Sequence, residues 1–176
     1  SGQMLWAKAE TLENAGDIDG AIAIYERLYD RNTSNAIVAN NLASLLSDHR
    51  DDAESLERAW RIARRLRNSD FPAFRDTYGW IAFRRGDVEE ALAHIAPAAE
   101  ALPGNPVVQY HLAAVFAALG RDTEALEQFK KVAEMGGNAA IIDIVDAEIA
   151  RLSAGTDADA GERDRKSTRL NSSHYS

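Results

Sequence analysis

A seven-residue pattern, Gly-x-x-x-Glu-Ala-Leu, occurs twice in this chain, at residues 86–92 and again at residues 120–126. The two copies are 34 residues apart, which is the size of a helix–turn–helix unit. Such a unit cannot bury its apolar face alone, so neighbouring units stack and share a continuous core. The repeat therefore predicts an all-α solenoid of stacked helical pairs.

The first half of the chain carries the same pattern less regularly. Residues 16–22 repeat the glycine turn and the helix start, and Ala59 lies 38 residues after Ala21 but 32 residues before Ala91. The second unit therefore holds about four extra residues, which we expect in its inter-helix turn. This spacing predicts four units, at about residues 2–35, 36–71, 72–105 and 106–137.

Small residues recur where two helices of a unit would cross. Helices about 8–10 Å apart leave no room there for a large side chain. The positions are Ala9, Ala43, Gly79 and Ala113 in the first helices, and Ala21, Ala59, Ala91 and Ala125 in the second helices. In this pattern the chain resembles the tetratricopeptide repeat (TPR) family, of bacterial type, over residues 2–137. The resemblance implies a right-handed TPR superhelix of about four helix pairs.

In the TPR family the first helices of the units line a concave groove that holds a partner. The resemblance implies that the groove residues here are Trp6, Glu10, Asn40, Asn41, Ser44, Asp76, Trp80, Phe83 and Tyr110. Aromatic side chains can bury a partner side chain, while amides and carboxylates can pair with its backbone or basic groups. The alternative for Trp80 and Phe83 is packing between units. Members that clamp a chaperone's C-terminal carboxylate use Lys and Arg, and only Asn41 matches their pattern, which argues against that mode.

Local chemistry predicts several helix ends. Asp51 followed by Glu54 is typical of a capping box, and Pro72 and Pro106 suit first-turn positions. Pro97 falls inside a predicted helix, where it should kink or split the helix at a cost of about 3 kcal/mol. The kink is either tolerated on the outer face or reshapes the groove.

Five arginines crowd one predicted helix of the second unit, with acidic residues beside them. We expect a solvated convex face with ion pairs inside the helix, rather than a patch for anionic lipid or phosphate. The arginines are Arg58, Arg61, Arg64, Arg65 and Arg67.

The C-terminal part divides into three segments. Residues 138–152 have apolar side chains at helical spacing, which predicts a capping helix or the first helix of a degenerate fifth unit. Residues 153–163 turn to Ala, Asp, Gly and Thr, which predicts a disordered linker. Residues 164–176 resemble a translated sequencing adapter, because Asp164 to His174 match its in-frame translation at every position. We therefore expect this tail to be an artefact on a fragment of a longer gene.

The charge of the chain constrains its partners. The formal charge is −8, and residues 164–176 contribute +2, from Arg165, Lys166 and Arg169 against Asp164, so residues 1–163 carry −10. An acidic body argues against nucleic acid and favours basic or neutral peptides. With no cysteine, disulfides and thiolate metal sites are excluded. No apolar run approaches the roughly 20 residues of a membrane span.

Catalytic patterns are missing from the sequence. His49, His94 and His111 share no helix face or metal-binding spacing, and neither a phosphate-binding glycine loop nor a nucleophile elbow is present. We therefore expect no enzyme activity, no cofactor and no metal site.

The leading functional expectation is a scaffold that holds a protein, a peptide or a partner helix in its groove. One alternative is the regulatory or substrate-recruiting arm of a larger enzyme, and another is self-association. Localisation stays open between the cytoplasm and the periplasm or envelope. Two short motifs, Asn-Asn-Leu-Ala-Ser-Leu-Leu at residues 40–46 and Asp-Thr-Tyr-Gly-Trp at residues 76–80, look similar to those of bacterial TPR proteins. Some of those proteins are envelope lipoproteins linked to exopolysaccharide or protein-sorting systems.

Overall fold

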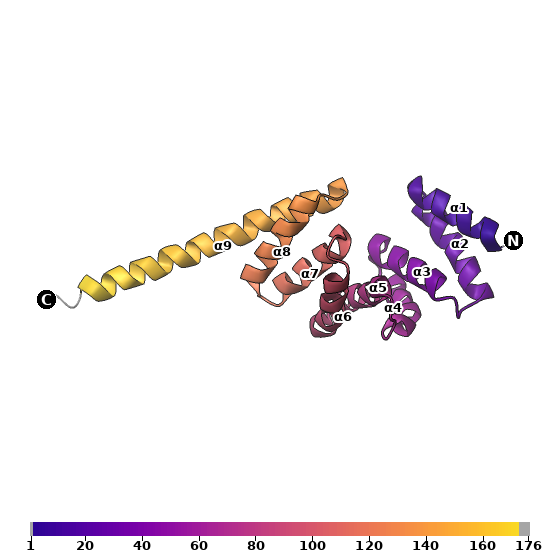
Figure 1. Cartoon of the computed structure of the whole chain (residues 1–176), viewed down its shortest axis with the longest axis horizontal. Helices are drawn as coiled ribbons and strands as arrows, with labels where there is room; N and C mark the ends of the chain where they lie inside the picture. The colour runs from indigo at the N-terminus through magenta and orange to yellow at the C-terminus, as the bar shows by residue number, and fades with distance from the viewer. Residues whose placement is uncertain (1, 173–176) are drawn as a thin grey trace. The chain divides into compact units, whose positions relative to one another are not determined.

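The computed structural model describes residues 2–172, and all the regular structure in that range is helical. The chain forms two compact units, residues 1–103 and residues 104–176 (Figure 1). Helical pairs follow one another along the chain, so the predicted fold class, an all-α solenoid, is confirmed.

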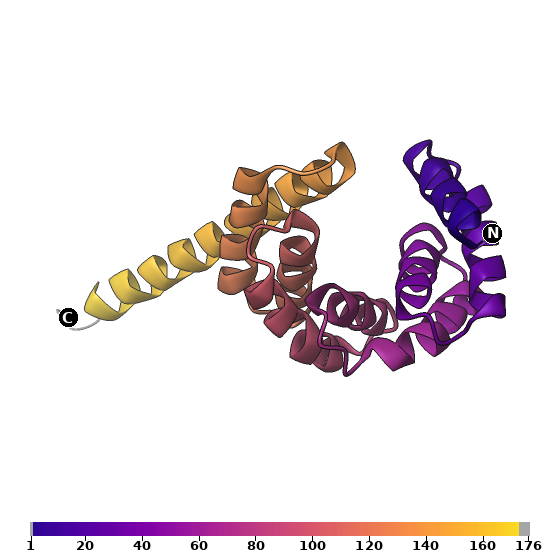
Figure 2. The ribbon, with the colours of Figure 1, turned by 45° about the vertical axis from the view of Figure 1, so that its right-hand side comes forward.

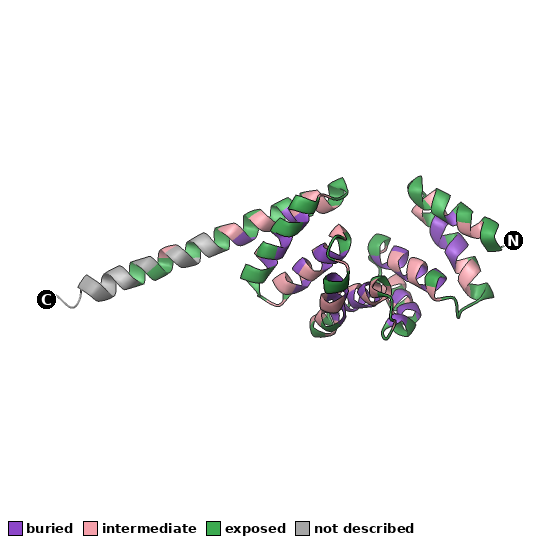
Figure 3. Cartoon of the chain, viewed as in Figure 1, coloured by how far each residue is buried: buried purple, intermediate pink, exposed green. Residues whose placement is uncertain are grey.

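The first unit contains three helical pairs (Figure 2). They are α1 (Gly2–Asn14) with α2 (Ile18–Arg31), α3 (Ala36–His49) with α4 (Ala53–Ala63), and α5 (Pro72–Arg84) with α6 (Val88–Ala101). A short 3-10 helix, η1 (Arg64–Leu66), extends α4. The pairs stack because α2 packs on α3, and α4 and α3 both pack on α5. Their shared core is buried (Figure 3), and its largest fully buried side chains are those of Tyr25, Leu42, Leu66, Ile81 and Ile95.

The second unit contains one pair and a long helix. The pair is α7 (Pro106–Ala118) with α8 (Asp122–Met135), and α9 (Ala139–Ser172) packs on both. Apolar side chains of α8 and α9 meet in its core, among them Phe129, Val132, Val145 and Leu152.

The recurring glycines explain how three of the four described helical pairs turn. Gly16, Gly86 and Gly120 have φ values of +80°, +92° and +69°. Backbone in this left-handed region favours glycine, because it has no Cβ. Each glycine lies two positions before the first residue of the second helix of its pair. The repeated glycine of the sequence pattern therefore lies in the turn between the two helices of its pair.

The capping box of α4 was predicted one residue too early. The N-cap is Asp52, whose Oδ1 accepts the backbone N–H of Ser55 at 2.8 Å. Asp51 instead pairs with Arg84 Nη2 of α5 at 3.1 Å. By residue type, either aspartate could be the N-cap. Asp51 pairs with Arg84 of α5, and Asp52 caps the helix.

Pro97 does not split α6, which runs unbroken from Val88 to Ala101. The proline ring removes the hydrogen bond to the carbonyl of Ala93. Ala93 is exposed, so water can take the place of the missing donor. This placement favours the tolerated-proline interpretation.

The structure corrects the predicted linker after Leu152. Residues 153–163 continue α9, which runs on to Ser172. The alanines, Glu162 and Arg163 favour a helix and no proline interrupts the segment, whereas its glycines and aspartates do not favour one. The likeness of residues 164–176 to an adapter concerns their origin, which a helical backbone does not test; residues 173–176 lie outside the described range.

The arginines of residues 58–67 also differ from expectation, because their partners lie on other helices. Arg58 Nε lies 2.7 Å from Glu26 Oε1, and Arg65 Nη2 donates to Tyr29 OH at 2.8 Å, both on α2. Arg67 Nε donates to Glu90 Oε1 of α6 at 2.8 Å. These three arginines bridge consecutive pairs, so the predicted pairing within one helix is wrong for them.

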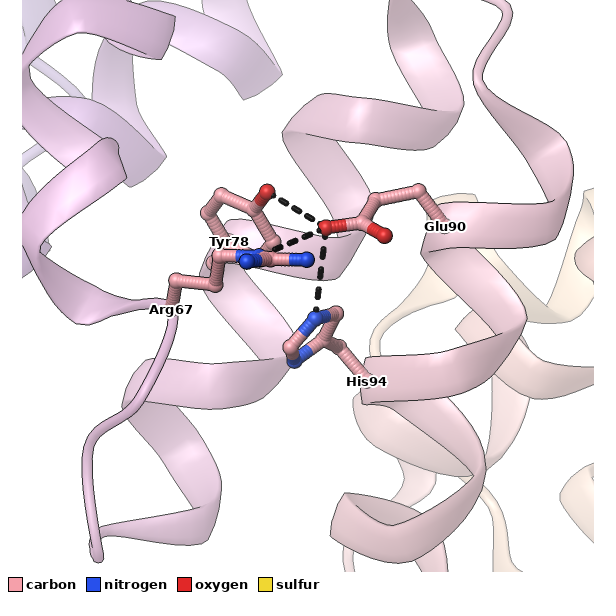
Figure 4. Close-up of polar contacts among 4 residues, drawn as sticks. All are labelled: Arg67, Tyr78, Glu90 and His94. Atoms are coloured by element: carbon pink, nitrogen blue, oxygen red, sulfur yellow. Dashed lines mark hydrogen bonds and ion pairs between the residues drawn. The ribbon is translucent and has the colours of Figure 1, made fainter.

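Glu90 is the centre of the junction between the second and third pairs (Figure 4). Besides Arg67, its Oε1 accepts a hydrogen bond from Tyr78 OH of α5 at 2.7 Å and lies 3.4 Å from His94 Nε2. The bonds from Arg67 and Tyr78 lower the pKa of Glu90. Burial, and then the bond to Glu90, raise the pKa of Tyr78 to about 12. Burial also lowers the pKa of His94, against the opposing charge of Glu90.

Candidate partner-binding groove

Two cavities lie in the first unit, and each is lined by residues of α1, α2 and α3. Together we call them the α1–α3 trough. One half is a polar cavity of about 450 Å³, lined by Glu10, Glu13 and Asn14 of α1, Tyr25 of α2 and Asn41 of α3. Both carboxylates are exposed. This acidic half has the chemistry to receive a cation.

Tyr25 fixes the floor of the acidic half. Its side chain is buried, and its hydroxyl accepts a hydrogen bond from Asn41 Nδ2 at 3.2 Å. Burial raises the pKa of the phenol; the bond from Asn41 opposes this, and the charges of Glu13 and Glu10 add to it. The phenol therefore stays neutral and leaves the negative charge of the cavity to the two glutamates.

The other half of the α1–α3 trough is a cleft of about 420 Å³ in which apolar surface predominates. Its apolar walls are Trp6 of α1, Leu28 of α2 and Val38 of α3, and its rim holds Gly2, Gln3, Arg31, Asn32 and Asn35. The Trp6 ring meets the Tyr25 ring edge-on, with centroids 5.7 Å apart. Trp6 Nε1 donates to Glu10 Oε1 at 2.8 Å, so this tryptophan joins the two halves.

Helical spacing explains why these side chains share one trough. Each helix contributes residues three or four apart, such as Trp6 and Glu10 on α1, Tyr25 and Leu28 on α2, and Val38 and Asn41 on α3. Residues at this spacing lie on one helix face. The trough is therefore a consequence of the packing of α2 against both α1 and α3.

The structure brings three of the predicted groove residues together in the trough: Trp6, Glu10 and Asn41. Asn40 Nδ2 donates to Asn41 Oδ1 at 3.2 Å, and the buried Oδ1 of Asn40 has no hydrogen-bond partner. Ser44 Oγ donates to Asp48 Oδ2 at 3.1 Å on α3. Asn40 and Ser44 therefore share α3 with Asn41, and their role in the groove stays a prediction.

The other predicted residues lie on α5 and α7. Trp80 and Phe83 stack on α5, with centroids 4.9 Å apart and planes 16° apart, and both are half-buried. Asp76 is only 5% exposed, which leaves little of it for a partner to reach. Tyr110 lies on α7 in the second unit, where its ring centroid is 6.3 Å from that of Phe129. These placements leave the groove role of the α5 and α7 residues a prediction.

Glu13, Tyr25, Arg31 and Val38 are among the trough residues that sequence reasoning missed. Tyr25 gave a usable signal, because it occupies a core position of α2 and a buried phenol needs a polar partner. Glu13 lies one turn after Glu10 on the same face. Val38 gave no such signal, since an apolar residue early in a first helix is typical of the core.

Two observations bear on other classes of site. Among the described residues, no three His, Asp or Glu side chains are grouped so that they could hold a metal ion. Within the same part of the chain, every helix is too short or too polar to span a bilayer.

The fold resembles those of solved TPR proteins. Structures of MamA (MSR-1) and MamA (AMB-1) match with TM-scores of 0.65 and 0.63, at 21% and 22% identity. The first covers 97% of both chains, and the second covers 95% of this chain and 96% of its own. TTC0263, a thermophilic TPR protein of Thermus thermophilus, matches with a TM-score of 0.64 at 21% identity, over 85% of this chain and 82% of its own.

Sequence comparison gives the family. No curated protein sequence matches the chain. Two family models described as tetratricopeptide repeat match it, one over residues 6–70 and the other over residues 82–143. Together the matches cover most of the helical pairs, and the chain belongs to the tetratricopeptide repeat family.

Proposed function

We propose that this chain is a protein-interaction scaffold that holds a peptide segment in the groove lined by α1, α3 and α5. The α1–α3 trough is the observation that carries the proposal. It combines apolar and polar walls and leaves the carboxylates of Glu10 and Glu13 exposed. Ligand-binding pockets commonly combine apolar walls with a few polar groups.

The charge of the molecule supports a basic or neutral partner. Residues 1–163 carry −10, as derived above from the formal charge of −8. Glu10 and Glu13 line the trough and are exposed, and Asp48, which accepts the hydrogen bond of Ser44 on α3, is exposed as well. A negative groove on a negative body attracts cationic segments and repels acidic ones.

Selection from a random peptide display library tests this proposal directly. Peptides that bind the full chain would be synthesised, and their affinities measured by fluorescence anisotropy. We expect a Ser44→Lys/Asp48→Lys double variant to weaken the binding of basic peptides by about tenfold, because it reverses the charge of the groove on α3. Glu89→Lys changes an exposed charge on α6 and serves as the matched control.

The expected result is a loss in the groove variant that the control does not share. Equal affinities for the wild type and both variants would place the bound peptides elsewhere on the surface. A selection that yields no specific binder would also contradict the proposal.

A further inference from the structure

We propose that the α1–α3 trough recognises an extended peptide segment that carries a bulky apolar side chain and a Lys or Arg four residues apart. This inference rests on the proposed function and names the class of segment that the first unit selects. The apolar side chain occupies the cleft of Trp6, Leu28 and Val38, and the cation lies beside Glu10 and Glu13.

The two cavities of the trough follow one another along α1. Along α1, Gly2, Gln3 and Trp6 line the apolar cleft, and Glu10, Glu13 and Asn14 line the acidic cavity. The same order holds on the other two helices: Leu28 precedes Tyr25 along the trough, and Val38 precedes Asn41. A ligand that lies parallel to α1 therefore meets an apolar wall first and a negative wall second.

The length of the trough sets the spacing of the ligand. On α1, the residues that line the apolar cleft (Gly2, Gln3 and Trp6) and those that line the acidic cavity (Glu10, Glu13 and Asn14) are centred about eight to nine residues apart. This corresponds to about 13 Å along α1 at ~1.5 Å per residue. An extended peptide covers this distance in about four residues at ~3.3 Å each. Side chains at i and i+4 of a strand also point to the same side, as the trough requires.

The polar rim favours an extended backbone over a helix. Asn14, Asn32 and Asn35 line the trough with carboxamide groups. An extended segment presents unpaired backbone N–H and C=O groups that need such partners, whereas a helix satisfies its own. Asn35 Oδ1 already accepts the N–H groups of Ile37 and Val38, so its amino group is the part that can donate to a ligand.

Charge complementarity decides between a basic and an acidic ligand. Glu10 and Glu13 are both exposed carboxylates one turn apart, and the buried phenol of Tyr25 beneath them is neutral. Arg31 is the one cation among the lining residues of either half, and it lies at the far end of the apolar cleft. A cationic side chain in the acidic half meets two opposite charges there and no like charge.

The test uses short synthetic peptides and the full chain. The probes are fluorescently labelled Ser-Leu-Ser-Ala-Ser-Arg-Ser and its reverse order, because the trough fixes the spacing and not the chain direction. Matched peptides replace Leu by Ala, replace Arg by Glu, or place Leu and Arg next to each other. We expect one of the two orders to bind, and each matched peptide to bind at least about fivefold more weakly in anisotropy titrations.

Charge reversal supplies the decisive comparison. Glu10→Gln/Glu13→Gln should weaken the binding of the Arg peptide by about fivefold to tenfold and remove the salt dependence of its affinity. Glu10→Lys/Glu13→Lys should reverse the preference, so that the Glu peptide binds more tightly than the Arg peptide, because both charges of the cavity change sign. Glu89→Gln on α6 is the control and should change neither peptide. The Leu-to-Ala change is made in the peptide, so the apolar half is tested without destabilising the protein.

The outcomes separate this inference from the proposed function. If display-selected peptides respond to Ser44→Lys/Asp48→Lys but not to Glu10→Gln/Glu13→Gln, the groove binds peptides and our assignment of the trough is wrong. If the adjacent-residue peptide binds as well as the spaced one, the extended four-residue spacing is wrong. If neither peptide order binds while selected peptides do, the trough is not the recognition site.

Discussion

The carboxylate of Glu90 joins three elements of the first unit through a single oxygen. Oε1 accepts hydrogen bonds from Arg67, in the segment after η1, and from Tyr78 of α5. It also contacts His94 of α6 itself. Arg75 adds a second positive charge near His94, and burial together with the two arginines outweighs the attraction of Glu90. The junction is therefore built around a neutral histidine.

Acidification should weaken this junction. The pKa of His94 is lower in the folded chain than its ordinary value of 6.5, so the unfolded chain binds more protons just below that pH. Stability therefore falls as pH drops from about 6.5 towards the folded pKa. We expect the free energy of unfolding, measured in urea between about pH 7.5 and 5.5, to decrease less in His94→Gln than in the wild type.

His49 offers the matched control, because it is exposed at the end of α3. His49→Gln should keep the pH dependence of the wild type. Keeping the measurements above about pH 5 separates the effect from Glu90, whose lowered pKa acts only below its ordinary range. Equal slopes in the wild type and in His94→Gln would contradict the account.

Gly79 determines how closely α5 approaches α6. A Cβ at this position would lie 2.7 Å from Ile95 Cγ1 and 3.3 Å from both the carbonyl oxygen of Ala91 and His94 Cβ. We expect Gly79→Ala to lower the free energy of unfolding by about 1–3 kcal/mol, because the two helices must move apart. The higher helix propensity of alanine, up to about 1 kcal/mol, offsets part of this cost.

Gly104 is the comparison for this crossing, since nothing lies within 4 Å of a Cβ built there. Chemical denaturation of both variants would measure the difference. We expect Gly104→Ala to change stability by less than about 0.5 kcal/mol. A Gly79→Ala variant as stable as the wild type would show that α6 can move away from α5 without lowering the free energy of unfolding.

The N-terminus of α4 depends on Asp52. Removing its carboxylate in Asp52→Ala leaves the N–H of Ser55 without its acceptor, so we expect a loss of about 0.5–2 kcal/mol in denaturant titrations. Asp51→Ala removes an exposed ion pair with Arg84 and should cost less than about 1 kcal/mol. The reverse order would support the capping box predicted from the sequence.

The helical pairs could be predicted because their causes are local. Turn glycines, small residues at crossings and first-turn prolines act within a few residues of where they stand. The partners of the arginines could not be predicted in this way. Arg58 meets Glu26 from 32 positions away and Arg65 meets Tyr29 from 36 away, so these contacts depend on the stacking of whole pairs.

Within each compact unit of the molecule, the described helical pairs contact only their neighbours, so local changes should stay local. Leu152 is the last buried residue of α9 among those whose side chains the structure describes. We expect removal of residues 153–176 to shift Tm by less than about 2 °C while it lowers the helical circular dichroism signal.

Removal of residues 139–176 is the contrasting variant. It would expose Phe129 and Val132, which pack in one cluster with Val145 and Leu152. We therefore expect a clearly lower Tm than that of the shorter truncation. A fall of more than about 4 °C from the shorter truncation would instead mean that the end of α9 supports the fold.

The site could be predicted only in part. Trp6, Glu10 and Asn41 follow from their places on first helices, and the structure gathers them in one trough. The floor, made by Tyr25 and Leu28, belongs to a second helix, which the family resemblance assigns to the outer layer. Its role depends on the register of three helices, which no single segment of sequence determines.

The position of α1 makes ligand affinity in the trough depend on whether this helix is docked. Among the described helices, α1 packs on α2, and it supplies the acidic wall of the trough. A segment can bind there only while α1 is docked, so the apparent Kd equals the intrinsic Kd divided by the docked fraction. Ligand affinity would then report the opening equilibrium of the first helix, and amide exchange in α1 should slow as the trough fills.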